Sequence, residues 1–222
     1  MAEASHRNLF IPGPVGRLET VFWTPAEEKP PLAVVMCHPH PLFGGTLHNK
    51  VVYQVARTMD RLGLPVLRFN FRGAGMSEGT HDRGRGELED VRAAVNFLAG
   101  EYPGVPLIVA GFSFGCWVGL RAGCEDSRVI ELIGLGAPVG DSDFSYLLTC
   151  DKPRLLITGE HDQYGPPAKL EQFVSTFPEK LRSETRVVIV PGVDHFFVGK
   201  LNKVDEAIAD WLTQRHPEIS SR

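Results

Sequence analysis

A serine stands midway between two glycines in Gly111-Phe112-Ser113-Phe114-Gly115, a spacing that suits nucleophilic chemistry. The apolar run Leu107–Ala110 precedes it and an apolar, small-residue segment follows, which predicts a buried strand, a tight turn and the start of a helix. A strand that reverses at once into a helix crowds the turn, so the flanking glycines, which have no Cβ, fit there. Such a turn lifts the Ser113 hydroxyl above the sheet at a helix N-terminus, where free N–H groups favour negative charge.

Histidines and acids follow three other apolar runs. These segments are His38-Pro39-His40-Pro41 after LAVVMC, Glu160-His161-Asp162 after RLLITG and Val193-Asp194-His195 after TRVVIVPG. A serine hydroxyl is a poor nucleophile at neutral pH and needs an adjacent base, which histidine supplies because its pKa lies near the working pH. A carboxylate can fix the tautomer of that histidine and stabilise the imidazolium that forms. The chain order Ser113, Asp162, His195 is that of one known fold class.

Apolar runs and helical periodicity alternate along the chain from residue 32 onward. Strands are expected at 32–37, 65–71, 107–110, 129–136, 154–159 and 185–190, and helices at 48–62, 87–98, directly after the serine, at about 167–177 and at 201–216. Two further strands within 8–23 flank a Pro-Gly turn. This alternation implies an α/β protein with parallel crossover units and helices on both faces of one sheet. Ligands bind such sheets at the carboxyl ends of the strands, where the segments above fall.

Length, composition and charge indicate a globular chain with one large core. The 222 residues are 43% hydrophobic and 23% charged, with a formal net charge of −4, and we expect a single domain over 1–222. No basic stripe or charged tail stands out, which disfavours nucleic acid and membrane as partners. The sequence has no membrane-spanning run and no apolar signal core at its start, and its four cysteines form no CxxC pattern. We therefore expect reduced thiols in a cytoplasmic protein.

The chain resembles the α/β-hydrolases and, within them, the small serine hydrolases that lack a lid. Besides the serine turn, the resemblance rests on RFNFRGAGMSEG at 68–79, which is similar to the common strand-end R-G-x-G-x-S, on GEHD at 159–162 and on DHFF at 194–197. It covers nearly the whole chain. It implies the α/β-hydrolase fold, with a mostly parallel twisted sheet, helices on both faces and no cap domain. It also implies a carboxylesterase-like activity without a cofactor or metal.

The resemblance assigns roles to three residues. Ser113 would be the nucleophile, His195 the general base and then the general acid, and Asp162 the carboxylate that orients His195. Asp141 and Asp143 stay open as alternative acids, because some α/β-hydrolases carry the acid after the preceding strand. Asp162 is preferred because GEHD stands directly at the end of a strand.

Two backbone N–H groups are expected to form an oxyanion hole. One belongs to Phe114, the residue after the nucleophile, and the other to the HPHP loop at 38–41. The two prolines of this loop have no N–H to donate, which leaves His40, with Leu42 a poorer candidate. The family resemblance indicates the same position for the second donor. His38 is expected to shape the loop through hydrogen bonds.

Other polar residues near these motifs are expected to be structural. We expect Arg72 to anchor its loop, Asp194 to hold the turn beside His195, Cys116 to pack in its helix, and His81 and His161 to be solvent or loop histidines. The spacing of His38, His40 and His48 fits no compact zinc motif, so no metal site is expected.

The connection between two of the expected strands is too short for a lid. Ala137–Pro153 has only 17 residues, room for one short helix, whereas larger relatives insert a helical cap there. We therefore expect an open, shallow acyl pocket for small or short-chain esters, or for an exposed chain end of a larger molecule. Six aromatic residues are candidates for its walls: Phe43, Phe112, Phe144, Tyr146, Tyr164 and Phe196. Phe43, Tyr164 and Phe196 are the preferred substrate contacts, and core packing is the alternative for Phe112 and Phe196.

The leading expectation is a serine hydrolase that cleaves small carboxylic esters through an acyl-enzyme. A thioesterase or a small peptidase would use the same residues, and a non-catalytic scaffold on a hydrolase fold is a further alternative. Dienelactone-type hydrolases generally carry cysteine at the turn, and haloalkane dehalogenases and epoxide hydrolases carry a carboxylate, so Ser113 disfavours all three. The expected partner is a small-molecule ester. Monomer and homodimer, the latter through the N-terminal strand edge, both stay open.

Overall fold

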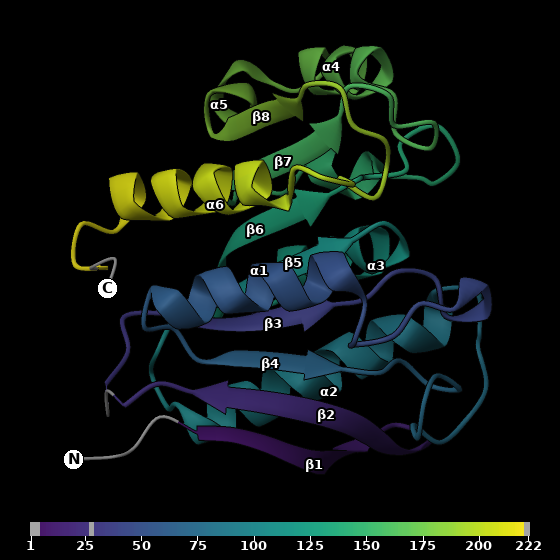
Figure 1. Ribbon diagram of the computed structural model, residues 1–222, viewed down its shortest axis with the longest axis vertical. Coiled ribbons are helices and arrows are strands. Elements are labelled where there is room, and N and C mark those ends of the chain that lie inside the picture. The colour runs from purple at the N-terminus through teal and green to yellow at the C-terminus, as the bar shows by residue number, and fades with distance from the viewer. Residues whose placement is uncertain (1–4, 27–28, 220–222) are drawn as a thin grey trace.

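The computed structural model describes residues 5–26 and 29–219, whose strands form one eight-stranded sheet (Figure 1). The strands are β1 (Ser5–Gly13), β2 (Gly16–Thr24), β3 (Ala33–Cys37), β4 (Val66–Phe69), β5 (Leu107–Phe112), β6 (Val129–Leu135), β7 (Arg154–Gly159) and β8 (Thr185–Val190). The helices are α1 (Lys50–Arg61), α2 (Arg85–Glu101), α3 (Phe114–Glu125), α4 (Pro167–Ser175), α5 (Glu179–Ser183) and α6 (Leu201–Arg215). Two short 3-10 helices are η1 (Pro41–Phe43) and η2 (Ser145–Leu148).

The strand order is β1-β2-β4-β3-β5-β6-β7-β8. The β1–β2 and β2–β4 pairs are antiparallel, and every pair from β4 to β8 is parallel, which confirms the mostly parallel α/β sheet. The chain moves from β3 to β4 on one side and returns to β5 on the other, so the direction of the crossovers reverses at β3. Ligand sites in such sheets lie at the carboxyl ends of the strands beside such a reversal. Here those ends are Cys37 and Phe112.

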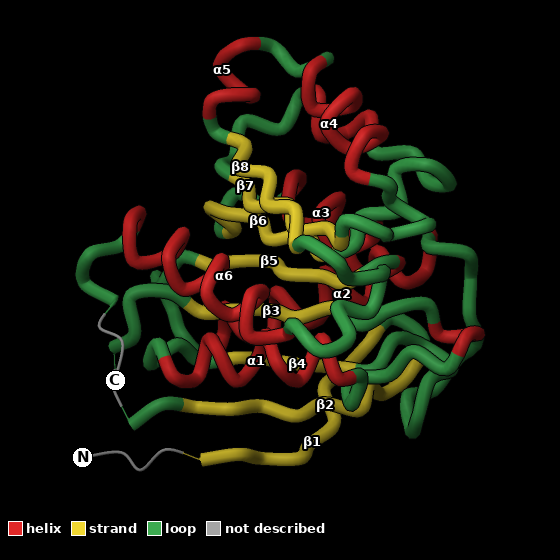
Figure 2. The backbone as a smooth tube through the Cα atoms, turned by 45° about the horizontal axis from the view of Figure 1, so that its top comes forward, coloured by secondary structure: helices red, strands yellow, loops and turns green. Residues whose placement is uncertain are grey.

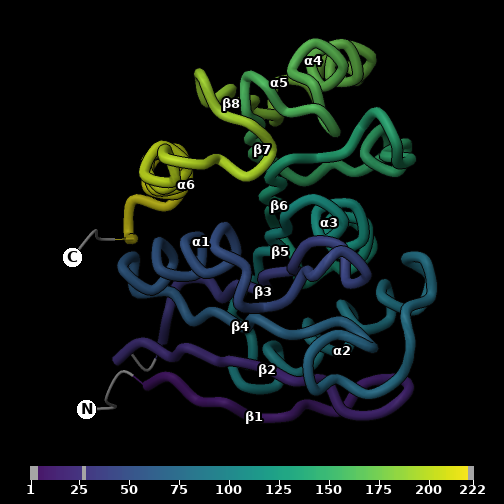
Figure 3. Tube along the Cα trace, turned by 45° about the vertical axis from the view of Figure 1, so that its right-hand side comes forward, coloured from purple at the N-terminus to yellow at the C-terminus, as the bar shows by residue number. Residues whose placement is uncertain are grey.

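Helices cover both faces of the sheet, as predicted. Figure 3 shows α1 and α6 on one side of the strands and α2 and α3 on the other. Side chains along a strand alternate between the two faces. In β3, Val34 and Met36 pack with the α1 and α6 side chains, whereas Val35 and Cys37 pack with those of α2 and α3. Both faces of β3 are therefore buried, which explains its continuous apolar sequence.

The predicted elements are present, with most ends shifted by a few residues. The helix expected at 87–98 begins earlier, at Arg85, and α5 was not predicted. The connection at 137–153 contains only η2, so no cap covers the sheet. The parallel strands point to the right in Figure 1, and the loops that follow them gather at that edge in Figure 2. In the described part of the chain, no helix combines the length and hydrophobicity needed to cross a membrane.

Candidate active site

Ser113 is the single residue between β5 and α3. Its backbone has φ +56° and ψ −119°, a left-handed conformation that side-chain-bearing residues seldom adopt. Its N–H donates to the carbonyl of Leu135 at 2.9 Å, which ties the turn to the end of β6. The predicted order of strand, turn and helix is present. The strained conformation holds the serine at the carboxyl edge of the sheet, on the N-terminus of α3.

The two glycines that flank Ser113 are required by close backbone packing. A Cβ placed on Gly111 would lie 2.2 Å from the carbonyl oxygen of Gly115. A Cβ placed on Gly115 would lie 2.4 Å from the carbonyl oxygen of His38 and 2.5 Å from that of Cys37. The G-x-S-x-G spacing therefore lets the turn fold against itself and against the end of β3.

Asp162 and His195 form a buried pair at the same edge. His195 Nδ1 lies 2.8 Å from Asp162 Oδ2, and the two residues are 3% and 2% exposed. The second carboxylate oxygen accepts the N–H groups of Tyr164 and Gly165, each at 2.9 Å. Burial acts to raise the pKa of the Asp162 carboxyl, but the hydrogen bonds from His195, Gly165 and Tyr164 hold this pKa below its usual value. The ionised carboxylate selects the Nδ1–H tautomer of His195 and leaves Nε2 as the acceptor.

Packing fixes the plane of the His195 ring. The ring centroid lies 4.9 Å from that of Phe112, 4.8 Å from Tyr164 and 5.2 Å from Phe196. A Cβ on Gly136 would lie 2.8 Å from His195 Cε1. Gly136 directly follows β6, and the N–H of Ser113 donates to the carbonyl of Leu135, the last residue of β6. The serine and the imidazole therefore both adjoin the carboxyl end of β6.

The alternative acids lie elsewhere. Asp143 accepts the N–H of Ser145 through Oδ1 at 2.8 Å, and its carbonyl accepts Nε1–H of Trp117. Asp141 and Asp143 are both exposed. The structure brings Asp162, rather than either of these residues, into contact with His195.

His38 controls the peptide that carries the His40 N–H. The N–H of Phe71 donates to His38 Nε2 at 2.9 Å, so the ring proton is on Nδ1, which donates to the Pro39 carbonyl at 2.6 Å. Burial lowers the pKa of His38 to about 3, so the ring is neutral. The Pro39 carbonyl and the His40 N–H belong to one planar peptide, and fixing the first fixes the direction of the second. His38 therefore shapes the loop, as predicted.

The two residues expected to supply the oxyanion donors are in side-chain contact. The His40 and Phe114 rings have centroids 4.8 Å apart. Within residues 29–219, no backbone carbonyl accepts a hydrogen bond from either N–H. The N–H of Leu42, the poorer candidate, donates to His40 Nδ1 at 3.2 Å. This hydrogen bond leaves His40 as the better donor of the HPHP loop.

His81 lies in the loop between β4 and α2, as the loop alternative expected, but its side chain is largely shielded from solvent. Its side chain is 9% exposed, and its Nδ1 lies 2.8 Å from Glu87 Oε1. The N–H groups of Asp82 and Gly84 donate to the same carboxylate, each at 2.8 Å, which folds the loop onto the start of α2. The His81 ring packs against His40 at 4.8 Å between centroids. The missed signal is Glu87, an acid in the first turn of an expected helix, where it can accept backbone N–H groups. His161 is exposed, as predicted.

The aromatic candidates for the pocket divide into exposed and buried residues. Phe43 is 85% exposed, and Tyr164 and Phe196 are exposed beside the His195 ring. Phe112 is fully buried against that ring, so the alternative that it packs in the core is correct. Phe196 is exposed, so the same alternative is wrong for it. Phe144 is buried and Tyr146 donates its hydroxyl proton to the carbonyl of Trp117, so the expectation that these two line the pocket is wrong. They lie in the segment that packs on α3 in place of a cap.

The other residues expected to be structural have such contacts. The buried Arg72 guanidinium binds both carboxylate oxygens of Asp90, with Nη2 2.7 Å from Oδ1, and anchors the loop after β4. Asp194 Oδ1 accepts the N–H of Phe196 at 2.9 Å and holds the turn beside His195. Cys116 is buried in α3. These interactions support the site without adding a reacting group.

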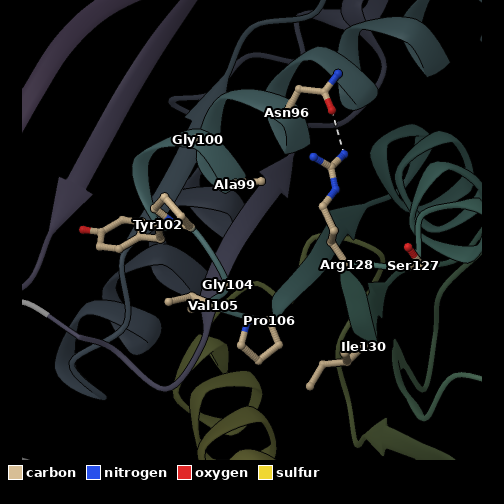
Figure 4. Close-up of a pocket in the computed structure, with 11 residues that line it drawn as sticks. Asn96, Ala99, Gly100, Tyr102, Gly104, Val105, Pro106, Ser127, Arg128 and Ile130 are labelled. Carbon is tan, nitrogen blue, oxygen red and sulfur yellow. Dashed lines mark hydrogen bonds between the residues drawn. The ribbon is translucent and has the colours of Figure 1, made fainter.

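A separate shallow cavity lies at the opposite edge of the sheet (Figure 4). Its volume is about 700 Å³, and its walls come from the end of α2 and the segments that enter β5 and β6. Its one charged residue, Arg128, is bound by Asp126 and donates to Asn96 Oδ1 at 2.6 Å. In residues 5–26 and 29–219, no group of three or more His, Cys, Asp or Glu side chains is arranged to hold a metal ion.

Comparison with known proteins identifies the family. A sequence model for the family described as serine aminopeptidase, S33, matches residues 28–149, and the chain belongs to this family of α/β-hydrolases. An uncharacterised protein of Rickettsia prowazekii is 32% identical over 210 residues, which cover 92% of this chain and 87% of the relative. A Xanthomonas campestris structure, described as an α/β serine hydrolase without a lid, is 34% identical and has a TM-score of 0.86, with 95% of each chain covered. A monoacylglycerol lipase of Mycolicibacterium smegmatis is 35% identical over 46% of this chain and 36% of its own length.

These similarities confirm the resemblance to α/β serine hydrolases without a lid. The chain has the α/β-hydrolase fold, and its family and similar structures identify it as an α/β serine hydrolase.

Proposed function

We propose that this serine hydrolase cleaves small or short-chain carboxylic esters through an acyl-enzyme. The observation that carries the proposal is the buried hydrogen bond between His195 and Asp162 at the edge that presents Ser113 on its strained turn. A nucleophile, a base and a carboxylate that orients the base are the groups that acyl transfer needs. The partial similarity to a monoacylglycerol lipase supports an ester as the substrate.

Acylation starts at the Ser113 hydroxyl. Its oxygen attacks the ester carbonyl while His195 Nε2 accepts the proton, and Asp162 stabilises the imidazolium that results. The N–H groups of His40 and Phe114 donate to the oxyanion of the tetrahedral intermediate, and each such donor contributes about 3–4 kcal/mol. The imidazolium then protonates the leaving alcohol. Water, deprotonated by the same imidazole, hydrolyses the acyl-enzyme and restores the serine.

The substrate reaches this edge of the sheet without a lid to cover it. Phe43, Tyr164 and Phe196 are exposed around the site and would form the apolar walls of a shallow pocket. Such walls can bury only a short acyl chain, because apolar stabilisation scales with the area removed from water. A small ester, or an ester at the exposed end of a larger molecule, fits this arrangement.

The same residues can also cleave a thioester or an amide, and the family description names an aminopeptidase. Steady-state hydrolysis of p-nitrophenyl acetate, butyrate and palmitate, of an acetyl thioester and of an aminoacyl p-nitroanilide separates these activities. The proposal expects the highest kcat/KM on the acetate or butyrate and none in Ser113→Ala. A clear preference for palmitate, the thioester or the anilide would contradict it.

We also propose that the chain works as a single domain on a small-molecule ester, without a nucleic-acid or membrane partner, as a monomer or homodimer. Four free cysteines suit a reducing compartment such as the cytoplasm.

A further inference from the structure

Two imidazole rings stand side by side next to the expected oxyanion donors. The ring centroids of His40 and His81 are 4.8 Å apart, and those of His40 and Phe114 are also 4.8 Å apart. The His81 ring centroid lies 5.6 Å from that of Phe114. The proposed mechanism uses the backbone N–H groups of His40 and Phe114 and gives neither imidazole a role.

The His40 ring carries its proton on Nε2. The N–H of Leu42 donates to His40 Nδ1 at 3.2 Å, so Nδ1 has the lone pair. Burial and the neighbouring His81 ring lower the pKa of His40, so the ring is neutral near neutral pH. A neutral imidazole that accepts a hydrogen bond at Nδ1 has its N–H at Nε2. His40 Nε2 is therefore a hydrogen-bond donor.

The His81 ring has the opposite arrangement. Its Nδ1 lies 2.8 Å from Oε1 of the buried Glu87 carboxylate. A negative oxygen at this distance repels a lone pair on Nδ1 and favours a proton there. The same relationship holds between Asp162 and His195. His81 Nε2 is therefore a hydrogen-bond acceptor.

Both Nε2 atoms lack a protein partner. Among residues 5–26 and 29–219, no hydrogen bond or ion pair ends on Nε2 of His40 or of His81. The buried polar side-chain atoms that lack a partner in these residues do not include either Nε2 atom, so both are open to solvent. A donor and an acceptor on adjoining rings are thus available to a ligand.

A hydroxyl group matches this pair of rings. A hydroxyl both accepts a hydrogen bond through its oxygen and donates one through its proton, whereas a carbonyl or an anion only accepts and an ammonium only donates. We propose that His40 and His81 form a binding site for a hydroxyl group of the substrate, with His40 Nε2–H as the donor and His81 Nε2 as the acceptor. The proposal rests on the proposed function, because the hydroxyl belongs to the ester that Ser113 cleaves.

The position of the rings limits where this hydroxyl lies in the ester. The N–H that binds the oxyanion and the ring that binds the hydroxyl both belong to His40. A hydroxyl at the ring is therefore only a few bonds from the ester carbonyl. It can belong to the acyl part or to the alcohol part of the substrate, since both present the same chemistry.

The protonation of the two rings can be tested without catalysis. Proton–nitrogen NMR correlation spectra of the imidazoles in the folded protein, recorded near neutral pH, should show His40 protonated at Nε2 and His81 protonated at Nδ1. The same tautomer in both rings, or an imidazolium at His81, would overturn the proposal.

Kinetics test the recognition with pairs of esters that differ by a hydroxyl in place of a methyl group. The alcohol part is tested with 2-hydroxyethyl butyrate against propyl butyrate, and the acyl part with ethyl 3-hydroxybutyrate against ethyl 3-methylbutyrate. We expect kcat/KM to be about tenfold higher for the hydroxyl ester of at least one pair. His81→Phe, which keeps a ring but has no acceptor, should bring this ratio to about one, whereas His161→Phe, at an exposed position, should keep it. Ratios near one in both pairs for wild type, or a preference that survives in His81→Phe, would overturn the proposal.

Binding decides the proposal if wild type cleaves none of the four esters, a result that would instead contradict the esterase activity. Each hydroxyl ester is then titrated into the protein, and the imidazole signals of His40 and His81 are followed by NMR. These signals should shift more with the hydroxyl ester of at least one pair than with its methyl counterpart. Equal shifts within both pairs, or none, would overturn the hydroxyl site. If His81→Phe does not fold, the wild-type ratios and the two tautomers decide.

Discussion

The imidazole of His38 donates a 2.6 Å hydrogen bond to the carbonyl of Pro39 and thereby fixes the peptide plane that presents the His40 N–H. The N–H of Phe71, which lies two residues after the end of β4, donates to the other ring nitrogen, Nε2. This hydrogen bond sets the tautomer of His38. The direction of one backbone N–H thus depends on a side chain that does not touch the substrate.

His38→Ala should lower kcat with little change in KM. The Pro39–His40 peptide loses its restraint, and a misdirected oxyanion donor weakens transition-state binding by about 10²–10³-fold at most. His38→Gln, which can accept from Phe71 and donate to Pro39, should recover part of the rate. The measurement is steady-state hydrolysis of p-nitrophenyl butyrate. His161→Ala, on an exposed side chain of the same edge, is the matched control and should match wild type. Equal loss in the Ala and Gln variants would argue against this role.

Asp162→Asn should reduce kcat by about 10⁴-fold, because the amide no longer selects the productive tautomer of His195. Activity assays on folded protein, checked by circular dichroism, measure this loss. A variant within tenfold of wild type would assign the orienting role to another residue.

The stability that Asp162 contributes should depend on pH. The folded-state pKa of this carboxyl is below the unfolded value of about 3.9, so its contribution is present above about pH 4 and is lost as the pH falls through the folded pKa. Urea unfolding of wild type and Asp162→Asn measures the difference in unfolding free energy. This difference should shrink between about pH 6 and pH 3. A difference that grows on acidification would contradict the direction of the shift.

Gly115→Ala should destabilise the protein by about 1–3 kcal/mol or more, because the new Cβ overlaps two carbonyl oxygens at the end of β3. Gly100→Ala in α2 is the matched control. Its Cβ would meet nothing within 4 Å, and alanine is favoured over glycine in a helix by about 1 kcal/mol. Chemical denaturation should therefore move the two midpoints in opposite directions. If Gly115→Ala left the denaturation midpoint unchanged, the turn would be able to relax around the new Cβ.

Glu87→Ala should cost about 1–3 kcal/mol of stability, since two backbone N–H groups and His81 lose their acceptor. Glu87→Gln keeps an acceptor and should lose less. Glu89→Ala, an exposed position on the same helix, should change the unfolding free energy by less than about 0.5 kcal/mol. Thermal or urea unfolding compares the three variants. If Glu87→Ala were as stable as Glu89→Ala, the buried carboxylate would not hold the loop.

Strand ends explain why so much of this site could be predicted. Ser113 follows β5 directly, and Asp162 and His195 follow β7 and β8 within three and five residues. Parallel strands bring their carboxyl ends to one edge, so the convergence of these residues could be predicted, whereas their roles came from the resemblance to α/β-hydrolases. The burial of the His81 side chain was missed, because it depends on a loop that folds back onto the Glu87 carboxylate. The positions of Phe144 and Tyr146 depend on how the 137–153 segment packs on α3, and that segment has no periodicity from which its burial follows.

The most direct test of the proposed catalytic role of Ser113 is its covalent labelling. Wild type, Ser113→Ala and His195→Ala are incubated with a fluorophosphonate, and their intact masses are measured over time. We expect one adduct in wild type, none in Ser113→Ala and a much slower adduct in His195→Ala, because the serine reacts readily only when the imidazole accepts its proton. If folded wild-type protein formed no adduct, or if all three proteins were labelled equally, Ser113 would not be an activated nucleophile. Either result would favour a non-catalytic scaffold.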